Sequence, residues 1–385
     1  MKARQAARLL AAHLEQPLEV WPAFDVGRVP FAIYDEREIV YLNHPSPPAE
    51  KPSLHAATRM KIGGVEAAIV PANFVKDEAG LVSLAYHEAF HVYQEDGGFE
   101  PGPGFDFFAA LAYYPELDAD YLALCMLEES LYNSATRPLE EKSAVLAAAI
   151  RARRSILSRN EGARLLDDYS ERNEGTASYV EHRVAREIFG KSYPQVSGGS
   201  NRVRAYVTGA ALGRLLDDLG VSWKRRVESG MSPSDVLLDV FTDEVDLDSY
   251  DLISLRRIAH ENVRKLRSEV EHALTEAFSA GALIIVLPPH VEVRRTFNPQ
   301  HITSLGDGKL VYRGLRIDLP NGFANLSGNV LALENLPAGT LTFPVFDYEL
   351  KDGHLLASGP EVEIELRPVI KEKDHTYRLL TAAKP

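Results

Sequence analysis

The chain has almost no cysteine and no long apolar segment. Cys125 is its one cysteine among 385 residues, so no disulfide can form within the chain. It lies in an apolar helical stretch, where we expect a small buried side chain. The apolar run 282–287 is far too short to span a bilayer, and the N-terminal apolar run lacks the features of a signal peptide. We therefore expect a cytoplasmic protein with no membrane partner.

Positive charge is also in deficit. Lys and Arg number 42 against 55 Asp and Glu, which gives a net charge of −13 at pH 7. Such a chain repels phosphate backbones, so nucleic acid is not an expected partner. A chain of this length builds a core without metal or disulfide support. We therefore expect any metal site in it to carry out chemistry.

The spacing of apolar residues changes near residue 281. Before this point helical spacing dominates, and short β-like runs at 31–34, 39–42 and 65–70 indicate a small sheet. After it, Asp-Gly turns and period-two runs such as 362–366 predict β-hairpins. The expected fold is α+β, with a mainly helical region over 1–280 and a C-terminal, sandwich-like β domain over 281–385. Helices are expected over 3–15, 78–95, 204–218, 234–241 and 252–280, and over most of 105–187.

The most informative motif is His87-Glu88-Ala89-Phe90-His91. On a helix, positions i and i+4 share a face, so both imidazoles can bind one ion, as HExxH motifs bind zinc. The neighbouring residues are mostly apolar, which indicates a buried helix. Buried polar side chains need partners, and a shared metal supplies one. The alternative interpretation is a pair of hydrogen-bonded histidines on an ordinary helix.

A catalytic zinc site needs a third protein ligand. The stretch 173–177, Asn-Glu-Gly-Thr-Ala, is the best source. Its small residues let this helix pack closely on the helix of His87, so that Glu174 projects towards the ion. Glu171 and His182 remain alternatives, and Glu174 also fits an exposed helical acid, as do Glu171, Glu181 and Glu187.

An HExxH motif followed by Asn-Glu-Gly-x-Ala resembles the gluzincin zinc metallopeptidases, the thermolysin-like, peptidase MA-like clan. The resemblance covers two short blocks. It implies one Zn²⁺ per chain, held by His87, His91 and Glu174, with Glu88 as general base. It also implies that the region 1–280 is a zincin-like metallopeptidase domain.

Two features depart from the clan pattern. Glu174 follows His91 by 83 residues, a gap filled by an expected helical insertion over about 105–170. Thermolysin-like enzymes carry an Asp four residues after the ligand Glu to orient a histidine, and here that position is Ser178. A ligating histidine usually has such a partner, for which Asp167 and Asp168 are the candidates.

The sequence thus predicts a zinc-dependent metallopeptidase acting on peptide or protein substrates. Tyr206 is expected to donate to the oxyanion, with His182 as the other candidate and packing at a helix start as the plainer role of Tyr206. The strand 65–70 is expected to pair with an extended peptide. The alternatives are a non-catalytic zinc-binding or partner-binding scaffold and a zinc hydrolase of non-peptide amides.

Overall fold

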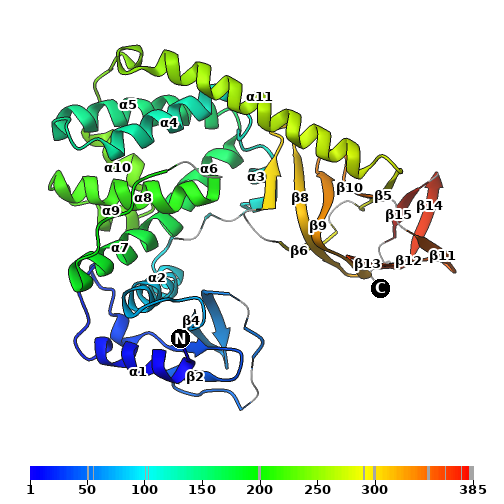
Figure 1. Cartoon of the computed structure of the whole chain (residues 1–385), viewed down its shortest axis with the longest axis horizontal. Helices are drawn as coiled ribbons and strands as arrows, with labels where there is room; N and C mark the ends of the chain where they lie inside the picture. The colour runs from blue at the N-terminus through cyan, green and yellow to red at the C-terminus, as the bar shows by residue number, and fades with distance from the viewer. Residues whose placement is uncertain are drawn as a thin grey trace. The chain divides into compact units, whose positions relative to one another are not determined.

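The computed structural model describes residues 1–49, 52–54, 56–99, 101–102, 104–197, 201–288, 291–297, 301–344, 347–359, 361–373 and 375–380. The chain is mixed α+β (Figure 1). It divides into two compact units. Unit 1 contains Met1–Pro103, Glu128–Arg151 and Asp167–Leu247, and unit 2 contains Gly104–Leu127, Ala152–Leu166 and Asp248–Pro385. Every predicted site residue lies in unit 1.

Unit 1 begins with a helix and a small sheet. The four strands are β1 (Phe31–Tyr34), β2 (Ile39–Leu42), β3 (Thr58–Ile62) and β4 (Val65–Pro71), in the order β2-β1-β4-β3. Only the β1–β4 pair is parallel. Helix α1 (Ala3–Leu14) contacts β1 and β2, whereas α2 (Glu78–Asp96) contacts β3 and β4.

The position of β4 corrects one expectation. It pairs with β1 on one side and β3 on the other. β3 pairs along 65–69 and β1 along 68–71, so the strand is internal to the sheet at its C-terminal end. The expected peptide addition along the strand at 65–70 is therefore wrong for this end, where both edges are hydrogen-bonded.

Helix α2 carries the HExxH motif through the interior of unit 1. Asp77 begins it as N-cap, since its side chain accepts a hydrogen bond from Gly80 N at 2.8 Å. The side chains of Tyr86, Ala89 and Phe90 are fully buried, and Phe90 packs against Trp21 with ring centroids 5.0 Å apart. The prediction of a buried helix is therefore confirmed.

The helices that face α2 come from later in the chain. A π-helical turn, η2 (Glu171–Gly175), leads into α7 (Thr176–Phe189), and α8 (Asn201–Asp218) packs against both. Helices α9 (Lys224–Glu228) and α10 (Pro233–Val240) complete unit 1. The expected insertion forms α3 (Phe107–Ala112), α4 (Ala119–Asn133), α5 (Leu139–Leu157) and α6 (Glu161–Ser170).

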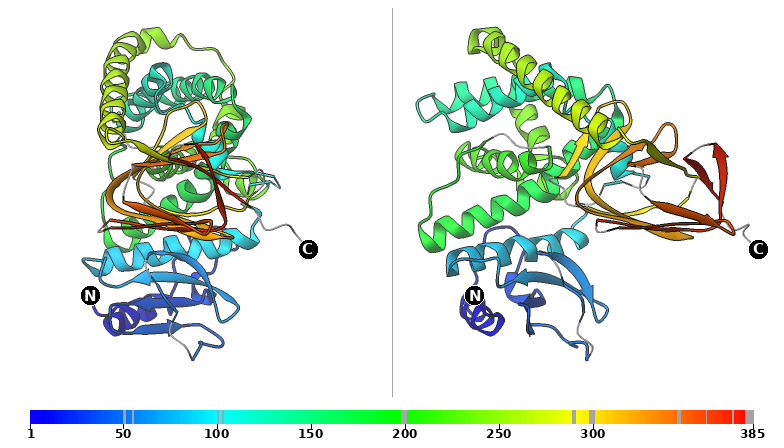
Figure 2. Two further views of the ribbon diagram at one scale, coloured as in Figure 1. Left: turned by 90° about the vertical axis from the view of Figure 1, so that its right-hand side faces the viewer. Right: turned by 45° about the vertical axis from the view of Figure 1, so that its right-hand side comes forward.

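Unit 2 is built around one sheet of eleven strands, which curls upon itself (Figure 2). The long strands β8 (Lys309–Leu319) and β9 (Gly322–Asn335) pair along most of their length. The other strands are β5 (Ala282–Val286), β6 (Arg294–Thr296), β7 (Ile302–Ser304), β10 (Thr340–Pro344), β11 (Tyr348–Lys351), β12 (His354–Gly359), β13 (Val362–Leu366), β14 (Val369–Lys373) and β15 (Thr376–Leu379). The predicted hairpins at 307–308 and 352–353 are confirmed.

The core of unit 2 joins helix and sheet. Buried residues of α3 and α4, Cys125 among them, belong to the same apolar cluster as those of β8 and β9. Helix α11 (Leu252–Ala277) adds Val270 to a smaller cluster with Val311 and Leu331. The boundary at residue 281 marks the change from helix to strand, and it lies inside unit 2. Independent folding of 281–385 stays a prediction.

None of the helices in the described residues combines the length and the apolar character that crossing a membrane requires.

Two glycines set the contact between η2 and α8. A Cβ on Gly209 would lie 2.4 Å from Gly175 Cα, and one on Gly175 would lie 2.9 Å from Gly209 Cα. No side chain fits between these backbones. Gly175 thus lets α8, rather than the HExxH helix, come close.

We predict that Gly209→Ala destabilises the protein by about 1–3 kcal/mol, because the added methyl group overpacks this contact. The loss is expected although Ala is the better helix former. Urea unfolding of the variant measures it. Gly102→Ala is the control, since a Cβ there meets nothing within 4 Å. Equal stability of the two variants would show that the helices simply move apart.

Candidate metal centre

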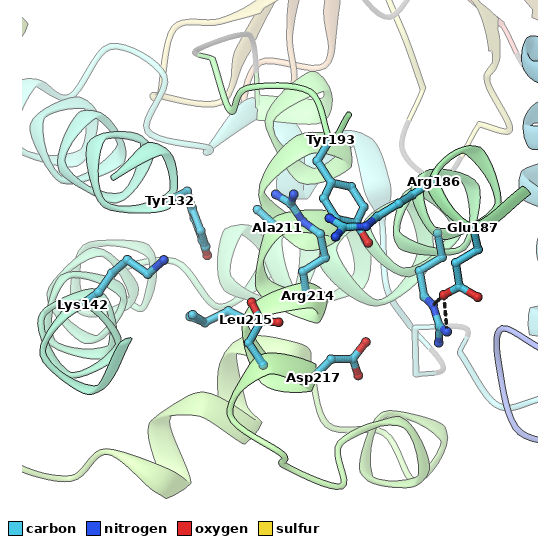
Figure 3. Close-up of a pocket in the computed structure, with 11 residues that line it drawn as sticks. Tyr132, Lys142, Arg186, Glu187, Tyr193, Ala211, Arg214, Leu215 and Asp217 are labelled. Carbon is cyan, nitrogen blue, oxygen red and sulfur yellow. Dashed lines mark hydrogen bonds and ion pairs between the residues drawn. The ribbon is translucent and has the colours of Figure 1, made fainter. Parts of the chain in front are cut away.

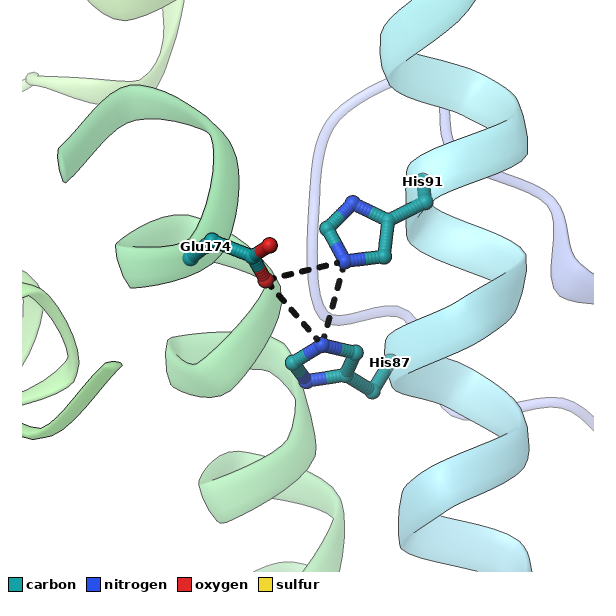
Figure 4. A group of neighbouring side chains, drawn as sticks. All are labelled: His87, His91 and Glu174. Carbon is teal, nitrogen blue, oxygen red and sulfur yellow. Dashed lines mark hydrogen bonds and ion pairs between the residues drawn. The ribbon is translucent and has the colours of Figure 1, made fainter. Parts of the chain in front are cut away.

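Three side chains from two helices meet in unit 1 (Figure 4). His87 and His91 lie on successive turns of α2, and Glu174 reaches them from η2. Glu174 Oε2 is 3.3 Å from His91 Nε2 and 3.7 Å from His87 Nε2. The two Nε2 atoms are 3.1 Å apart. The structure therefore brings together the three residues that the sequence selected.

Gln94 determines which ring nitrogen of neutral His91 carries the proton. The amide nitrogen of Gln94 donates to Asn173 O at 2.8 Å and to Thr176 Oγ1 at 2.9 Å, which turns its oxygen towards His91. His91 Nδ1 is 2.6 Å from this oxygen. An amide oxygen only accepts, so His91 carries its proton on Nδ1 and presents a lone pair on Nε2.

Glu181 does the same for His87. Its Oε2 is 2.9 Å from His87 Nδ1. Burial alone would raise the pKa of Glu181, but the hydrogen bond and the charge of His87 lower it, so the carboxylate is ionised. It therefore accepts the Nδ1 proton, and in the neutral form of the ring His87 Nε2 also presents a lone pair.

Three acceptor atoms thus converge on one point. Two imidazole lone pairs and a carboxylate oxygen repel one another unless a positive charge lies between them. Without a metal ion that charge is a proton. Burial lowers the pKa of His87, but hydrogen bonds to Glu174 and Glu181 outweigh it and raise the pKa to about 10. Burial would raise the pKa of Glu174, yet both imidazoles hold it well below its usual value.

The spacing of the three atoms also suits a metal ion. Two ligand atoms on a tetrahedral Zn²⁺, with bonds of about 2.0–2.1 Å, are about 3.3 Å apart. The three separations here are 3.1, 3.3 and 3.7 Å. Two imidazoles and a carboxylate are a donor set that zinc accepts, so these residues fit such an ion.

Glu88 lies next to this group and has an unused acceptor. It is 5% exposed, and its Oε2 has no hydrogen-bond partner among the described residues. Burial raises the pKa of Glu88, and the charges of His87 and His91 lower it by less. A buried carboxylate oxygen without a donor is costly, so its position is consistent with a role towards a ligand or a water molecule.

Tyr206 lies beside the same group. Its ring is parallel to that of His87, at an angle of 4° and with centroids 5.9 Å apart. The predicted oxyanion donor is therefore close to the predicted ligands. It lies on α8, which also carries Gly209.

The alternative third ligands are not in the His87–His91–Glu174 group. Glu171 Oε1 accepts from Ser234 N at 3.0 Å and from Ser234 Oγ at 2.6 Å, at the start of α10. The ring of His182 lies 6.5 Å from that of Tyr193. Asp167 and Asp168 lie near Glu171 in a second group of acids.

A scan against protein-family models finds no match for this chain, and neither the curated proteins nor the solved structures contain one. The clan resemblance therefore stays a prediction.

Sequence reasoning missed both partners of the histidines. It assigned that role to Asp167 or Asp168 and treated Glu181 as one exposed acid among several. Glu181 follows Glu174 by seven residues, which is close to two helical turns and places both on one face. Gln94 follows His91 by three residues and shares its face in the same way. These two spacings are the features of the sequence from which both partners could have been predicted.

We predict that Glu181→Gln weakens the binding of Zn²⁺ or Co²⁺ by about 10–100-fold, because an amide no longer fixes the His87 tautomer by charge. Competition with a metal indicator measures the affinity. Asp168→Asn, which removes the same charge at a residue the sequence favoured for this role, should change it little. A larger loss of metal affinity in Asp168→Asn than in Glu181→Gln would show that Asp168 orients the histidine.

Proposed function

We propose that the protein is a zinc-dependent metallopeptidase whose metal ligands are His87, His91 and Glu174. One observation carries the proposal. Nε2 of His87, Nε2 of His91 and Oε2 of Glu174 lie within 3.7 Å of one another. The two rings are oriented by hydrogen bonds at Nδ1, and Glu174 is placed by its helical turn. Beside them lies Glu88, a buried carboxylate that the ligand set does not use.

A bound Zn²⁺ supplies Lewis acidity, which makes water a nucleophile at neutral pH and polarises a carbonyl. The chain supplies the proton transfers. Glu88 accepts the proton of the attacking water and later donates it to the leaving amine. Burial disfavours the ionised form of Glu88 and so raises its pKa. A raised pKa makes the carboxylate a stronger base towards water, and the acid that forms can then donate the proton to the amine.

Tyr206 supplies a hydroxyl donor on the His87 side of the group. A donor held in place before the reaction stabilises negative charge on the substrate oxygen without reorganisation. Gln94 and Glu181 act through the histidines, because they fix which nitrogen of each ring presents its lone pair.

Support for the gluzincin likeness comes from the arrangement of elements. The HExxH helix α2 packs against the sheet of unit 1, and the acidic ligand comes from a separate helix that packs against α2. We propose a zincin-like fold for unit 1 on this basis, acting on peptide or protein substrates.

The ligand set is tested by metal content. We expect about one zinc per chain by elemental analysis, removed by a chelator with little loss of helical circular dichroism. Glu174→Gln should reduce the bound metal severely, because it removes one of three ligands. Glu171→Gln is the matched control one helical turn earlier, and His182→Ala tests the other alternative. Loss of metal only in His182→Ala would exclude Glu174 as ligand.

The general base is tested by activity. We expect Glu88→Gln to keep its zinc and to lose peptide hydrolysis by at least about 100-fold, since general-base catalysis contributes about 10²–10⁴-fold. Digestion of a mixed peptide library measures it. Glu78→Gln, on the exposed start of the same helix, is the control. Wild-type cleavage by the Glu88 variant would assign the base elsewhere.

A further inference from the structure

A second charged site lies on the other half of α7 and α8 (Figure 3). It is a surface hollow of about 570 Å³, wholly within unit 1. Arg186 enters it from α7 and Arg214 from α8, while Lys142 comes from α5. Tyr132 and Tyr193 add two aromatic rings to its wall.

The three cations named above lack carboxylate partners. None of Lys142, Arg186 and Arg214 forms an ion pair within the described part of the chain. The guanidinium of Arg214 lies 4.0 Å from the centre of the Tyr193 ring, and that of Arg186 lies 4.8 Å from it. Two like charges therefore share one aromatic ring.

Arg214 is the least satisfied of them. Its Nε is buried and has no hydrogen-bond partner among the described residues. Asp218 follows it by four residues on α8, yet the two do not form an ion pair. Burial lowers the pKa of Arg214, which reflects the cost of holding its charge there.

Two of the three acids that line the hollow, Glu187 and Asp217, accept hydrogen bonds from other residues. Glu187 Oε1 accepts from Arg183 Nε at 2.7 Å. Asp217 accepts from Tyr179 at 2.5 Å and from Trp223 Nε1 at 2.9 Å. They leave Arg186 and Arg214 available to an external anion.

We propose that this hollow binds a small molecule through an oxyanion group, a phosphate or a carboxylate, held by Arg186 and Arg214. Guanidinium groups match both anions in geometry. Four cations line the hollow against three acids, of which Asp218 acts on Arg214 through its charge alone, and a bound anion completes the balance. The volume falls within the about 300–1,000 Å³ of small-molecule pockets, so the ligand is larger than the anionic group itself.

The site is separate from the metal centre. Arg214 follows Tyr206 by eight residues on α8, which is about 12 Å along the helix axis. The proposal does not depend on hydrolysis.

Calorimetry on the full chain tests it, with inorganic phosphate and with succinate as two separate probes. A neutral chelator, 1,10-phenanthroline, removes metal that would itself bind phosphate. We expect saturable binding of at least one probe, at one site per chain and weaker at high salt. Binding of phosphate alone indicates a phosphorylated ligand, and binding of succinate alone indicates a carboxylate.

Arg186→Gln and Arg214→Gln should each weaken that binding about tenfold or more, since each removes a charge-assisted hydrogen bond. Arg186 is exposed, so its variant tests the site without disturbing the fold. Arg225→Gln removes the same charge from an exposed position of α9 outside the hollow and should bind as the wild type does. The proposal is overturned if neither probe binds or if the Arg225 variant loses as much as the other two.

Discussion

The hydrogen bonds of the Gln94 side-chain amide are the interaction on which the candidate metal centre depends. Gln94 is 1% exposed and joins α2 to the π-helical turn. The amide nitrogen donates to two backbone carbonyls of this turn, Arg172 O and Asn173 O. That commitment leaves only the oxygen for His91. One side chain thus holds the segment of Glu174 against α2 and also selects the tautomer of His91.

The π turn and the glycine contact act together on Glu174. The turn widens the helix at 171–175, and Gly175 and Gly209 let α8 approach from behind. Glu174 is consequently held from the helix side by backbone packing and from the α2 side by Gln94. Rigid support of this kind is what a preorganised site requires, because converging acceptors would otherwise move apart to relieve their repulsion.

Sequence reasoning found the parts of the site that have a fixed local spacing. His87, Glu88 and His91 follow from one helix, and Glu174 from a short stretch of small residues around an acid. Glu181 was not predicted because the clan pattern places the orienting acid four residues after the ligand Glu, where this chain has Ser178. Sequence reasoning missed β3, whose residues Thr-Arg-Met-Lys-Ile carry two charges, because an edge strand need not be apolar. The pairing of β4 on both sides is a long-range fact that no local pattern contains.

Two sites of opposite sign therefore occupy α7 and α8. Glu181 and Tyr206 lie in the N-terminal halves of these helices, near Glu174 of η2, and Arg186 and Arg214 lie in their C-terminal halves. Arg186 lies in the last turn of α7, where the helix dipole favours a cation. Local charge rather than the net charge of the chain therefore distinguishes the two ends of these helices.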